Sequence, residues 1–213
     1  MNQPYPENIS LVDFLTWEQQ QTDRFEWIDG IVVPYAGGSA QHSTIIANMT
    51  AIFHAATSDN GPCFVQTSDR RLIPRNVNGQ DLGSFYADLF VTCAAEDLDG
   101  DAAHFPTLVI EVLSPHIGDE FTRKKTAYLG SGRLIEYIIV DSTRRYVERF
   151  AWKSDTSGHR RLVTADYQRG PVPVPTFGLS IAFDQIYAKT KVPAILRPIL
   201  PDDEEETEII LDL

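Results

Sequence analysis

The chain has 213 residues, of which 43% are apolar and 23% charged, and its formal net charge is −12. This composition is typical of a soluble globular protein whose core needs no structural metal, and it excludes fibrous classes. No apolar run approaches the roughly 18 residues of a membrane span, and residues 1–10 hold no basic residue, so neither a span nor a signal peptide is expected.

Local signals in the first half predict a helix, a hairpin and a second helix. Ser10 is a good N-cap for a helix over residues 10–17. Asp29-Gly30 lies between two β-rich runs and predicts a hairpin over residues 25–33. The turn Gly37-Gly38-Ser39 precedes apolar residues at helical spacing, which predicts the second helix. Strands are expected at residues 63–67, 70–73 and 85–92.

The second half alternates buried strands with one long helix. Residues 107–113 form a nearly continuous apolar run, as expected of a central strand covered on both faces. A helix is predicted over residues 119–131, and strands over 136–141 and 145–153. Beyond Gly158, prolines indicate short edge strands, and one helical turn is expected at 184–189. We therefore predict one α/β domain with a mixed sheet over residues 1–200.

The two cysteines and the acidic C-terminus suggest two further properties. Cys63 and Cys93 lie in apolar stretches, and the prediction is reduced core thiols in a cytoplasmic protein. Residues 201–213 hold seven carboxylates and no base, which predicts a flexible acidic tail. Without this tail the chain has 23 acids and 18 bases, so it lacks the overall charge typical of a tight nucleic-acid binder.

Three acids occupy positions that predict burial. Glu111 interrupts the central apolar strand, Asp88 lies within the strand over 85–92, and Glu26 begins the hairpin between Phe25 and Trp27. A buried carboxylate costs several kcal/mol unless it is paired, protonated or bound to a metal ion. If the strands of Asp88 and Glu111 are neighbours, alternation lets the two carboxylates meet within about 5 Å and share one Mg²⁺ or Mn²⁺ ion.

Each acid also has a simpler interpretation. In these interpretations Glu111 pairs with a buried arginine, Asp88 ends a strand at the surface, and Glu26 faces solvent on the hairpin. His42, on the first turn of the second helix, either reaches a phosphate or the surroundings of a metal ion, or is a structural or surface histidine. The other histidines show no spacing typical of zinc ligands.

An ordered set of motifs resembles a known family. The set comprises Phe25-Glu26-Trp27-Ile28-Asp29-Gly30, Gly37-Gly38-Ser39-x-x-His42, Thr67-Ser68-Asp69, Tyr86-Ala87-Asp88, Glu111-Val112-Leu113-Ser114-Pro115, Lys124-x-x-x-Tyr128 and Glu136-Tyr137-x-x-x-Asp141. It is similar to the Uma-two family, bacterial proteins described as restriction endonucleases within the PD-(D/E)XK nuclease-like superfamily. The resemblance covers residues 11–183 and implies a restriction-endonuclease-like α/β core, with a mixed central sheet flanked by helices and extra C-terminal strands.

The resemblance also implies roles for the site residues. Asp88 and Glu111 would hold Mg²⁺ or Mn²⁺, and Glu26 would be a supporting acid. The lysine that normally follows the strand glutamate by two residues is replaced by Leu113, and the family's helical lysine matches Lys124. Two departures are Ala87, where the family usually has proline, and Glu120, where it tends to have aspartate.

The choice between Lys124 and Lys125 rests on two conflicting arguments. At about 100° per residue, Lys125 lies nearer the middle of the apolar helix face and Lys124 at its edge. A lysine at the edge can pack its stem on apolar atoms while its ammonium reaches the end of the sheet. The lysine-to-tyrosine motif also favours Lys124 as the hydrolytic lysine, with Lys125 contacting DNA phosphate or solvent.

These observations leave three functional hypotheses. The favoured one is a metal-dependent endonuclease that cleaves DNA, with Glu26, Asp88, Glu111 and Lys124 as catalytic residues and His42 as an accessory residue. By analogy with restriction enzymes it would act as a homodimer. The alternatives are a non-catalytic nucleic-acid-binding protein of the same fold, and an oligomeric interaction protein whose acids form structural ion pairs.

Overall fold

The computed structural model describes residues 5–58, 61–114, 118–194 and 206–209. Within these residues the helices are α1 (Leu11–Glu18), α2 (Ala40–Thr57), α3 (Asp119–Leu129) and α4 (Phe183–Ile186). The strands are β1 (Phe25–Ile28), β2 (Ile31–Pro34), β3 (Phe64–Thr67), β4 (Arg71–Leu72), β5 (Leu89–Thr92), β6 (Ala102–Ala103), β7 (Pro106–Leu113), β8 (Glu136–Asp141), β9 (Val147–Ser154), β10 (Arg160–Tyr167), β11 (Pro171–Val174), β12 (Leu179–Ala182) and β13 (Glu206–Ile209).

A seven-stranded mixed sheet forms the centre of the described structure, in the order β13-β10-β9-β8-β7-β5-β3. The strands β7 and β8 are parallel, and α3 forms the crossover between them. The remaining neighbours in the sheet pair antiparallel. The strand β7 lies inside the sheet between β8 and β5, and its apolar run is buried on both faces, as the sequence predicts.

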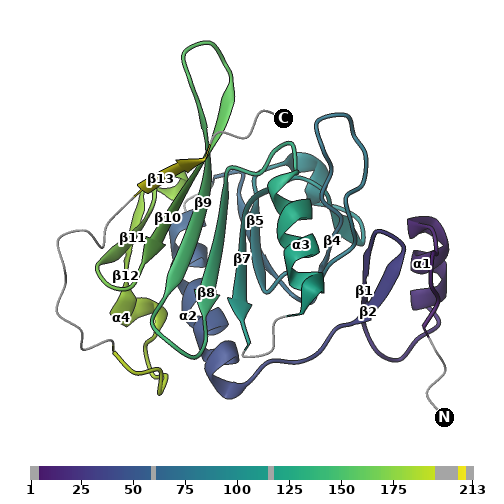
Figure 1. Cartoon of the computed structure of the whole chain (residues 1–213), viewed down its shortest axis with the longest axis horizontal. Coiled ribbons are helices and arrows are strands. Elements are labelled where there is room, and N and C mark those ends of the chain that lie inside the picture. Colours follow the sequence, from purple (N-terminus) through teal and green to yellow (C-terminus); the bar gives the residue numbers. More distant parts are fainter. Residues whose placement is uncertain (1–4, 59–60, 115–117, 195–205, 210–213) are drawn as a thin grey trace.

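Helices cover both faces of the sheet (Figure 1). Alternate residues of each strand point to opposite faces, so Leu89 and Ile110 pack with α2, whereas Phe90 and Val109 pack with α3. The small β11–β12 sheet and α4 add to the α2 side. Among the described residues, none of the helices combines the length and the apolar character that crossing a membrane requires.

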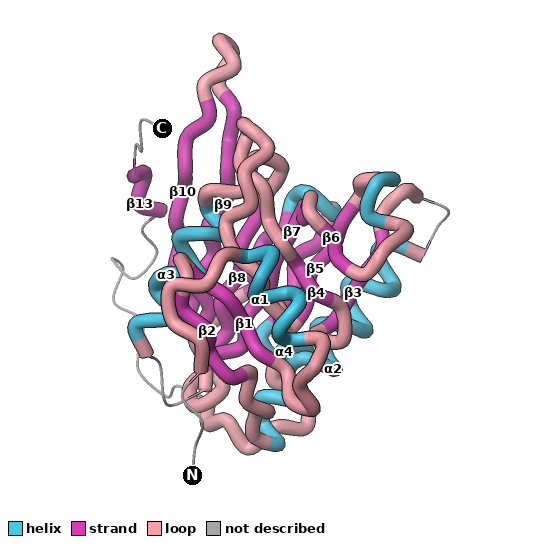
Figure 2. Tube along the Cα trace, turned by 90° about the vertical axis from the view of Figure 1, so that its right-hand side faces the viewer, coloured by secondary structure: helices cyan, strands magenta, loops and turns pink. Residues whose placement is uncertain are grey.

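The hairpin β1–β2 lies beside the sheet in Figure 1, faces the viewer in Figure 2, and contacts α3. Its turn needs a left-handed backbone, which Asp29 (φ 50°) and Gly30 (φ 83°) adopt. Trp27 pairs with Ser84 through an isolated bridge, so the hairpin is joined to the segment that precedes β5. This packing places Glu26 of β1 near the main sheet although it belongs to a separate ladder.

The segment before β5 differs from the prediction. A strand was expected over residues 85–92, but β5 begins at Leu89, and Asp88 precedes it. Phe85 instead pairs with Leu72 of β4 through an isolated bridge. The backbone groups of Ser84 and Phe85 therefore form their hydrogen bonds with β1 and β4, and not with a strand of the main sheet.

The prediction of reduced cysteines is wrong, because Cys63 and Cys93 form a disulfide. The β3–β5 register explains the proximity, since Phe64 pairs with Thr92 and the cysteines are the next residues outward on the two strands. Sequence spacing did not indicate this pairing because it depends on the antiparallel register of strands 30 residues apart.

The tail prediction also needs correction. Residues 206–209 form β13, which pairs antiparallel with residues 162–165 of β10, so this part of the segment is not a free appendage. The other residues of 201–213 lie outside the described residues.

The strand β10 spans eight residues and pairs along its length with β9, so it is longer than the short strands expected beyond Gly158. The β9–β10 ribbon projects beyond the rest of the sheet (Figure 1).

Deleting residues 201–213 should therefore lower stability. Removing β13 leaves β10 as an open sheet edge and removes its interstrand hydrogen bonds, so a loss of about 1 kcal/mol and greater self-association are expected. Chemical denaturation and light scattering measure these effects, and deletion of residues 210–213 alone is the control. An unchanged unfolding midpoint in the longer deletion would contradict the contribution of β13.

Candidate active site

Four separate segments of the chain bring charged side chains together at one end of the main sheet. Glu26 comes from β1, Asp88 precedes β5, Glu111 lies near the C-terminal end of β7, and Lys124 lies on α3. All four are buried, with exposed fractions of 5–8%. The sequence predictions for these residues therefore converge on one cluster.

The β5–β7 register explains how Asp88 meets Glu111. Leu89 pairs with Ile110, and one further step of this antiparallel register places Asp88 opposite Glu111. The Val112 backbone N–H donates to Oδ2 of Asp88 at 2.8 Å, which fixes this carboxylate against β7. Asp88 is therefore not a surface residue at a strand end.

Lys124 bridges two of the acids. Its Nζ donates to Oε1 of Glu26 at 2.8 Å and lies 3.1 Å from Oε1 of Glu111. The ammonium also lies 5.7 Å from the ring centroid of Phe85 and 6.0 Å from that of Tyr128, within reach of a cation–π contact. Glu111 thus pairs with a lysine and not with the arginine of the simpler interpretation.

Lys125 points to different partners. Its Nζ lies 3.6 Å from Oε2 of Glu148 on β9 and 4.0 Å from the ring centroid of Phe150. Both charged side chains of this pair are about one third exposed, at 29% and 30%. Of the two adjacent lysines, Lys124 is the one that reaches the acid cluster.

Glu26 and Glu111 are each held by a second donor. The Tyr86 backbone N–H donates to Oε1 of Glu26 at 2.8 Å, and the Tyr128 hydroxyl donates to Oε1 of Glu111 at 3.0 Å. Glu26 is therefore a buried, hydrogen-bonded residue and does not face solvent. Tyr128 follows Lys124 by one helical turn, so both reach the same carboxylate.

His42 completes the cluster from α2. Its Nε2 lies 3.1 Å from Oδ2 of Asp88, and its side chain is 11% exposed. Ser39 caps this helix and accepts a hydrogen bond from the His42 backbone N–H. A Cβ at Gly38 would lie 2.1 Å from Nδ1 of His42, so the absence of a side chain at Gly38 lets the imidazole approach the loop.

The cluster shifts several pKa values. Burial raises the pKa of Glu111 to about 8; the charge of Lys124 opposes this shift, and those of Asp88 and Glu26 add to it. Burial lowers the pKa of Lys124, but the charges of Glu111 and Glu26 outweigh burial and raise it. Burial also lowers the pKa of His42, and the hydrogen bond to Asp88, with its charge, raises it overall.

The acid cluster offers carboxylate oxygens, the type of ligand that hard divalent cations prefer. Glu26, Asp88 and Glu111 are three carboxylates, and Lys124 offsets one of them, with His42 adding a second positive charge when protonated. The described residues contain no group of three or more His, Cys, Asp or Glu side chains arranged to hold a metal ion. A pair of carboxylates is nevertheless a donor set that suits Mg²⁺, which keeps several waters and binds through one or two carboxylates.

Some contacts of the cluster were not predicted from the sequence. The hydrogen bond from the Tyr86 backbone N–H to Glu26 was not predicted. The ion pair of Glu18 and Arg71 was not predicted either, because no local sequence pattern indicates it. Tyr35 is half-buried, and its pKa is raised by burial, which a hydrogen bond to Ser68 opposes and the charge of Asp88 reinforces. The only sequence feature that points to Tyr35 as a neighbour of the cluster is its position two residues before the motif Gly37-Gly38-Ser39.

The fold and the acid cluster define a restriction-endonuclease-like α/β protein. The Uma2 family, described as "Putative restriction endonuclease", matches residues 11–184. The chain belongs to this family.

The chain is also similar to three known proteins. The chain is 30% identical over 188 residues to the uncharacterised Synechocystis protein slr1290, covering 86% of this chain and 93% of that protein. It is 27% identical over 146 residues to Synechocystis sll1609, covering 67% and 80%. The crystal structure of a "putative nuclease belonging to DUF820" from Anabaena variabilis superposes with a TM-score of 0.66 at 16% identity, covering 84% of this chain and 98% of that one. This likeness supports the fold.

Proposed function

We propose that the protein is a metal-dependent endonuclease that hydrolyses DNA phosphodiester bonds at the cluster of Glu26, Asp88, Glu111 and Lys124. The observation that carries the proposal is the convergence of three buried carboxylates and one buried lysine from four separate segments of the chain. Family membership supports a nuclease-like function. The proposal also includes Mg²⁺ or Mn²⁺ as cofactor, action as a homodimer and a cytoplasmic location.

In this proposal Asp88 and Glu111 hold the ion. When bound, Mg²⁺ or Mn²⁺ neutralises charge on the phosphate and lowers the pKa of a bound water. The proposed role of Lys124, whose ammonium lies 3.1 Å from Glu111, is to hold the attacking water and to offset the charge that develops on the phosphate.

The remaining residues orient these groups. Glu26 accepts from Lys124 and thereby fixes the direction of its ammonium. Tyr128 donates to Glu111 and restricts the rotation of its carboxylate. His42 contacts Asp88 at 3.1 Å and serves as the accessory residue that holds this acid.

A plasmid cleavage assay tests the proposal. Purified protein should nick or linearise supercoiled DNA with Mg²⁺ or Mn²⁺, and EDTA should stop the reaction. Glu111→Ala should lower the rate at least about 100-fold, because the ion loses one of its two carboxylates. Glu148→Ala, which removes a carboxylate from the same sheet face next to Lys125, is the matched control and should retain activity.

The second candidate is a non-catalytic nucleic-acid-binding or oligomeric interaction protein of the same fold. The bridge from Lys124 to Glu26 and Glu111 favours it, since these contacts already pair two of the acids without an ion. Binding of DNA without cleavage, in the presence of Mn²⁺, distinguishes this candidate from the enzyme.

A further inference from the structure

A second buried polar cluster lies directly behind Glu26. It joins Glu18 at the end of α1, Arg71 of β4 and Tyr86, which precedes β5. Glu18 and Tyr86 are 9% and 8% exposed, and the Arg71 side chain is 12% exposed. None of these three side chains is part of the proposed chemistry.

The three side chains form a closed set of hydrogen bonds. Arg71 Nη2 pairs with Oε2 of Glu18 and donates to the Tyr86 hydroxyl at 2.6 Å. That hydroxyl donates to Oε1 of Glu18 at 3.1 Å. The Arg71 guanidinium carbon also lies 4.8 Å from the centroid of the Tyr86 ring. The position of Tyr86 is thus fixed both at its ring and at its hydroxyl.

This cluster is connected to β1 through two consecutive residues, Phe25 and Glu26. The Phe25 N–H donates to Oε1 of Glu18 at 3.1 Å, and the Tyr86 N–H donates to Oε1 of Glu26 at 2.8 Å. Phe25 and Glu26 are consecutive, so one residue is held by the Glu18 side chain and the next by the Tyr86 backbone. The same oxygen of Glu26 accepts from Lys124.

Arg71 also sets the register of the segment that carries Asp88. Its Nη1 donates to Oγ of Ser84 at 2.6 Å, while the Ser84 backbone forms two hydrogen bonds with Trp27. One guanidinium therefore holds Ser84 and Tyr86, the residues that bond to Trp27 and Glu26. Asp88 follows Tyr86 by two residues, so the relative placement of the two acids depends on this contact.

A buried ion pair is weak evidence for stability, because its desolvation offsets much of its attraction. The pair can nevertheless fix geometry, because the forked guanidinium of Arg71 holds several partners in place at once. We infer that Glu18, Arg71 and Tyr86 are positioning residues that hold Glu26, and through it Lys124, in the geometry the site requires. This inference rests on the proposed function for its catalytic consequence.

The Tyr86→Phe variant tests the inference because it removes only the hydroxyl. We expect kcat to fall roughly tenfold with KM within about twofold, since misplacement of a catalytic group lowers turnover more than substrate binding. The amide at position 86 should exchange with solvent at least about tenfold faster, because its acceptor Glu26 is no longer held. Glu18→Gln, which weakens the same hydrogen bonds, should act in the same direction.

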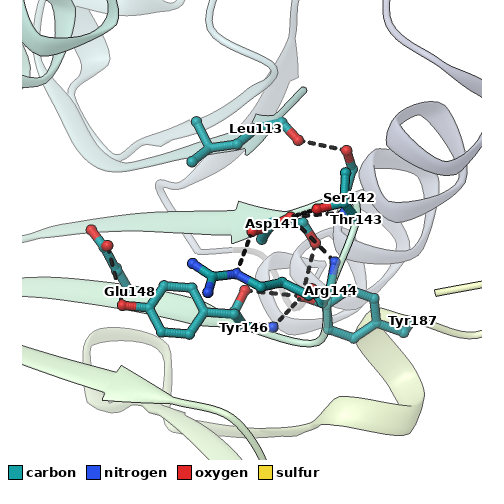
Figure 3. Close-up of polar contacts among 8 residues, drawn as sticks. All are labelled: Leu113, Asp141, Ser142, Thr143, Arg144, Tyr146, Glu148 and Tyr187. Carbon is teal, nitrogen blue, oxygen red and sulfur yellow. Dashed lines mark hydrogen bonds and ion pairs between the residues drawn. The ribbon is translucent and has the colours of Figure 1, made fainter. Parts of the chain in front are cut away.

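Tyr187→Phe is the matched control. Tyr187 is 2% exposed, and its hydroxyl contacts Asp141, Arg144 and Tyr146 in the β8–β9 turn (Figure 3). Removing this hydroxyl is the same chemical change, made outside the acid cluster. It should lower the unfolding midpoint while leaving kcat and the exchange rate at position 86 unchanged.

The two readouts separate the inference from the proposed function. If the wild-type protein does not cleave DNA but Tyr86→Phe selectively accelerates exchange at position 86, the positioning of Glu26 is supported and the proposed function fails. Wild-type kcat in Tyr86→Phe overturns the inference. Unchanged exchange at position 86, or an increase spread equally over the chain as in an ordinary loss of stability, overturns it as well.

Discussion

Replacing Lys124 with methionine is expected to destabilise the fold and abolish cleavage. The ammonium lies within 3.1 Å of both Glu26 and Glu111, and the side chain is 11% exposed. Removing one partner of a buried ion pair leaves uncompensated charge, which costs about 3–5 kcal/mol of unfolding free energy. Loss of the hydrolytic group should lower the cleavage rate at least about 100-fold. Urea denaturation and plasmid cleavage measure the two effects.

The adjacent lysine supplies the control for this experiment. Lys125→Met removes the same group from the same helix, but its pair with Glu148 spans 3.6 Å and is 29–30% exposed, so its loss should cost less than about 1 kcal/mol. Adding Glu26→Gln to Lys124→Met should restore part of the lost stability, because Glu26 is the acid that loses its lysine partner at 2.8 Å and the double variant no longer buries that carboxylate. Equal destabilisation by the two single variants contradicts the assignment of Lys124.

The second large effect concerns the pH dependence of stability. Burial raises the pKa of Glu111 to about 8, with Lys124 opposing the shift and Asp88 and Glu26 increasing it. Between its unfolded pKa near 4.5 and about 8, the folded protein keeps a proton that the unfolded chain releases. The contribution of Glu111 to unfolding free energy therefore falls as pH rises through this window and levels off above it.

Glu111→Gln removes this titration and should become increasingly stabilising with pH. The difference in unfolding free energy between variant and wild type should grow by roughly 4 kcal/mol from about pH 5 to 8.5, measured by denaturation in EDTA. Glu148→Gln, which changes another acid on the same sheet face, gives the comparison for a carboxylate that is about one third exposed. A difference that stays constant or shrinks with pH would show that the buried Glu111 is ionised throughout.

The sequence was informative where structure depends on local signals. The hairpin at Asp29-Gly30, the central strand containing Glu111 and the helix after it were predicted because turn chemistry, apolar runs and helical periodicity act over a few residues. Lys124 was selected over Lys125 by its place at the edge of the helix, and its ammonium does lie against Glu111. The catalytic roles themselves remain predictions.

Contacts between distant segments were less accessible to sequence reasoning. The disulfide of Cys63 and Cys93 depends on the register of two strands. The pairing of β13 with β10 depends on an available sheet edge, which the charge of the tail does not indicate. Asp88 was assigned to the interior of a strand, yet it precedes β5 because the residues before it bond to β1 and β4. Each of these features requires knowledge of the neighbouring element.

The position of bound manganese tests the central claim most directly. A crystal of the protein soaked in Mn²⁺ should give an anomalous difference peak with carboxylate oxygens of Asp88 and Glu111 at about 2.0–2.4 Å. Glu111→Ala crystals treated in the same way should lose the peak. A wild-type crystal without manganese at these two carboxylates, in which Lys124 still bridges Glu26 and Glu111 and His42 still contacts Asp88, would contradict the account.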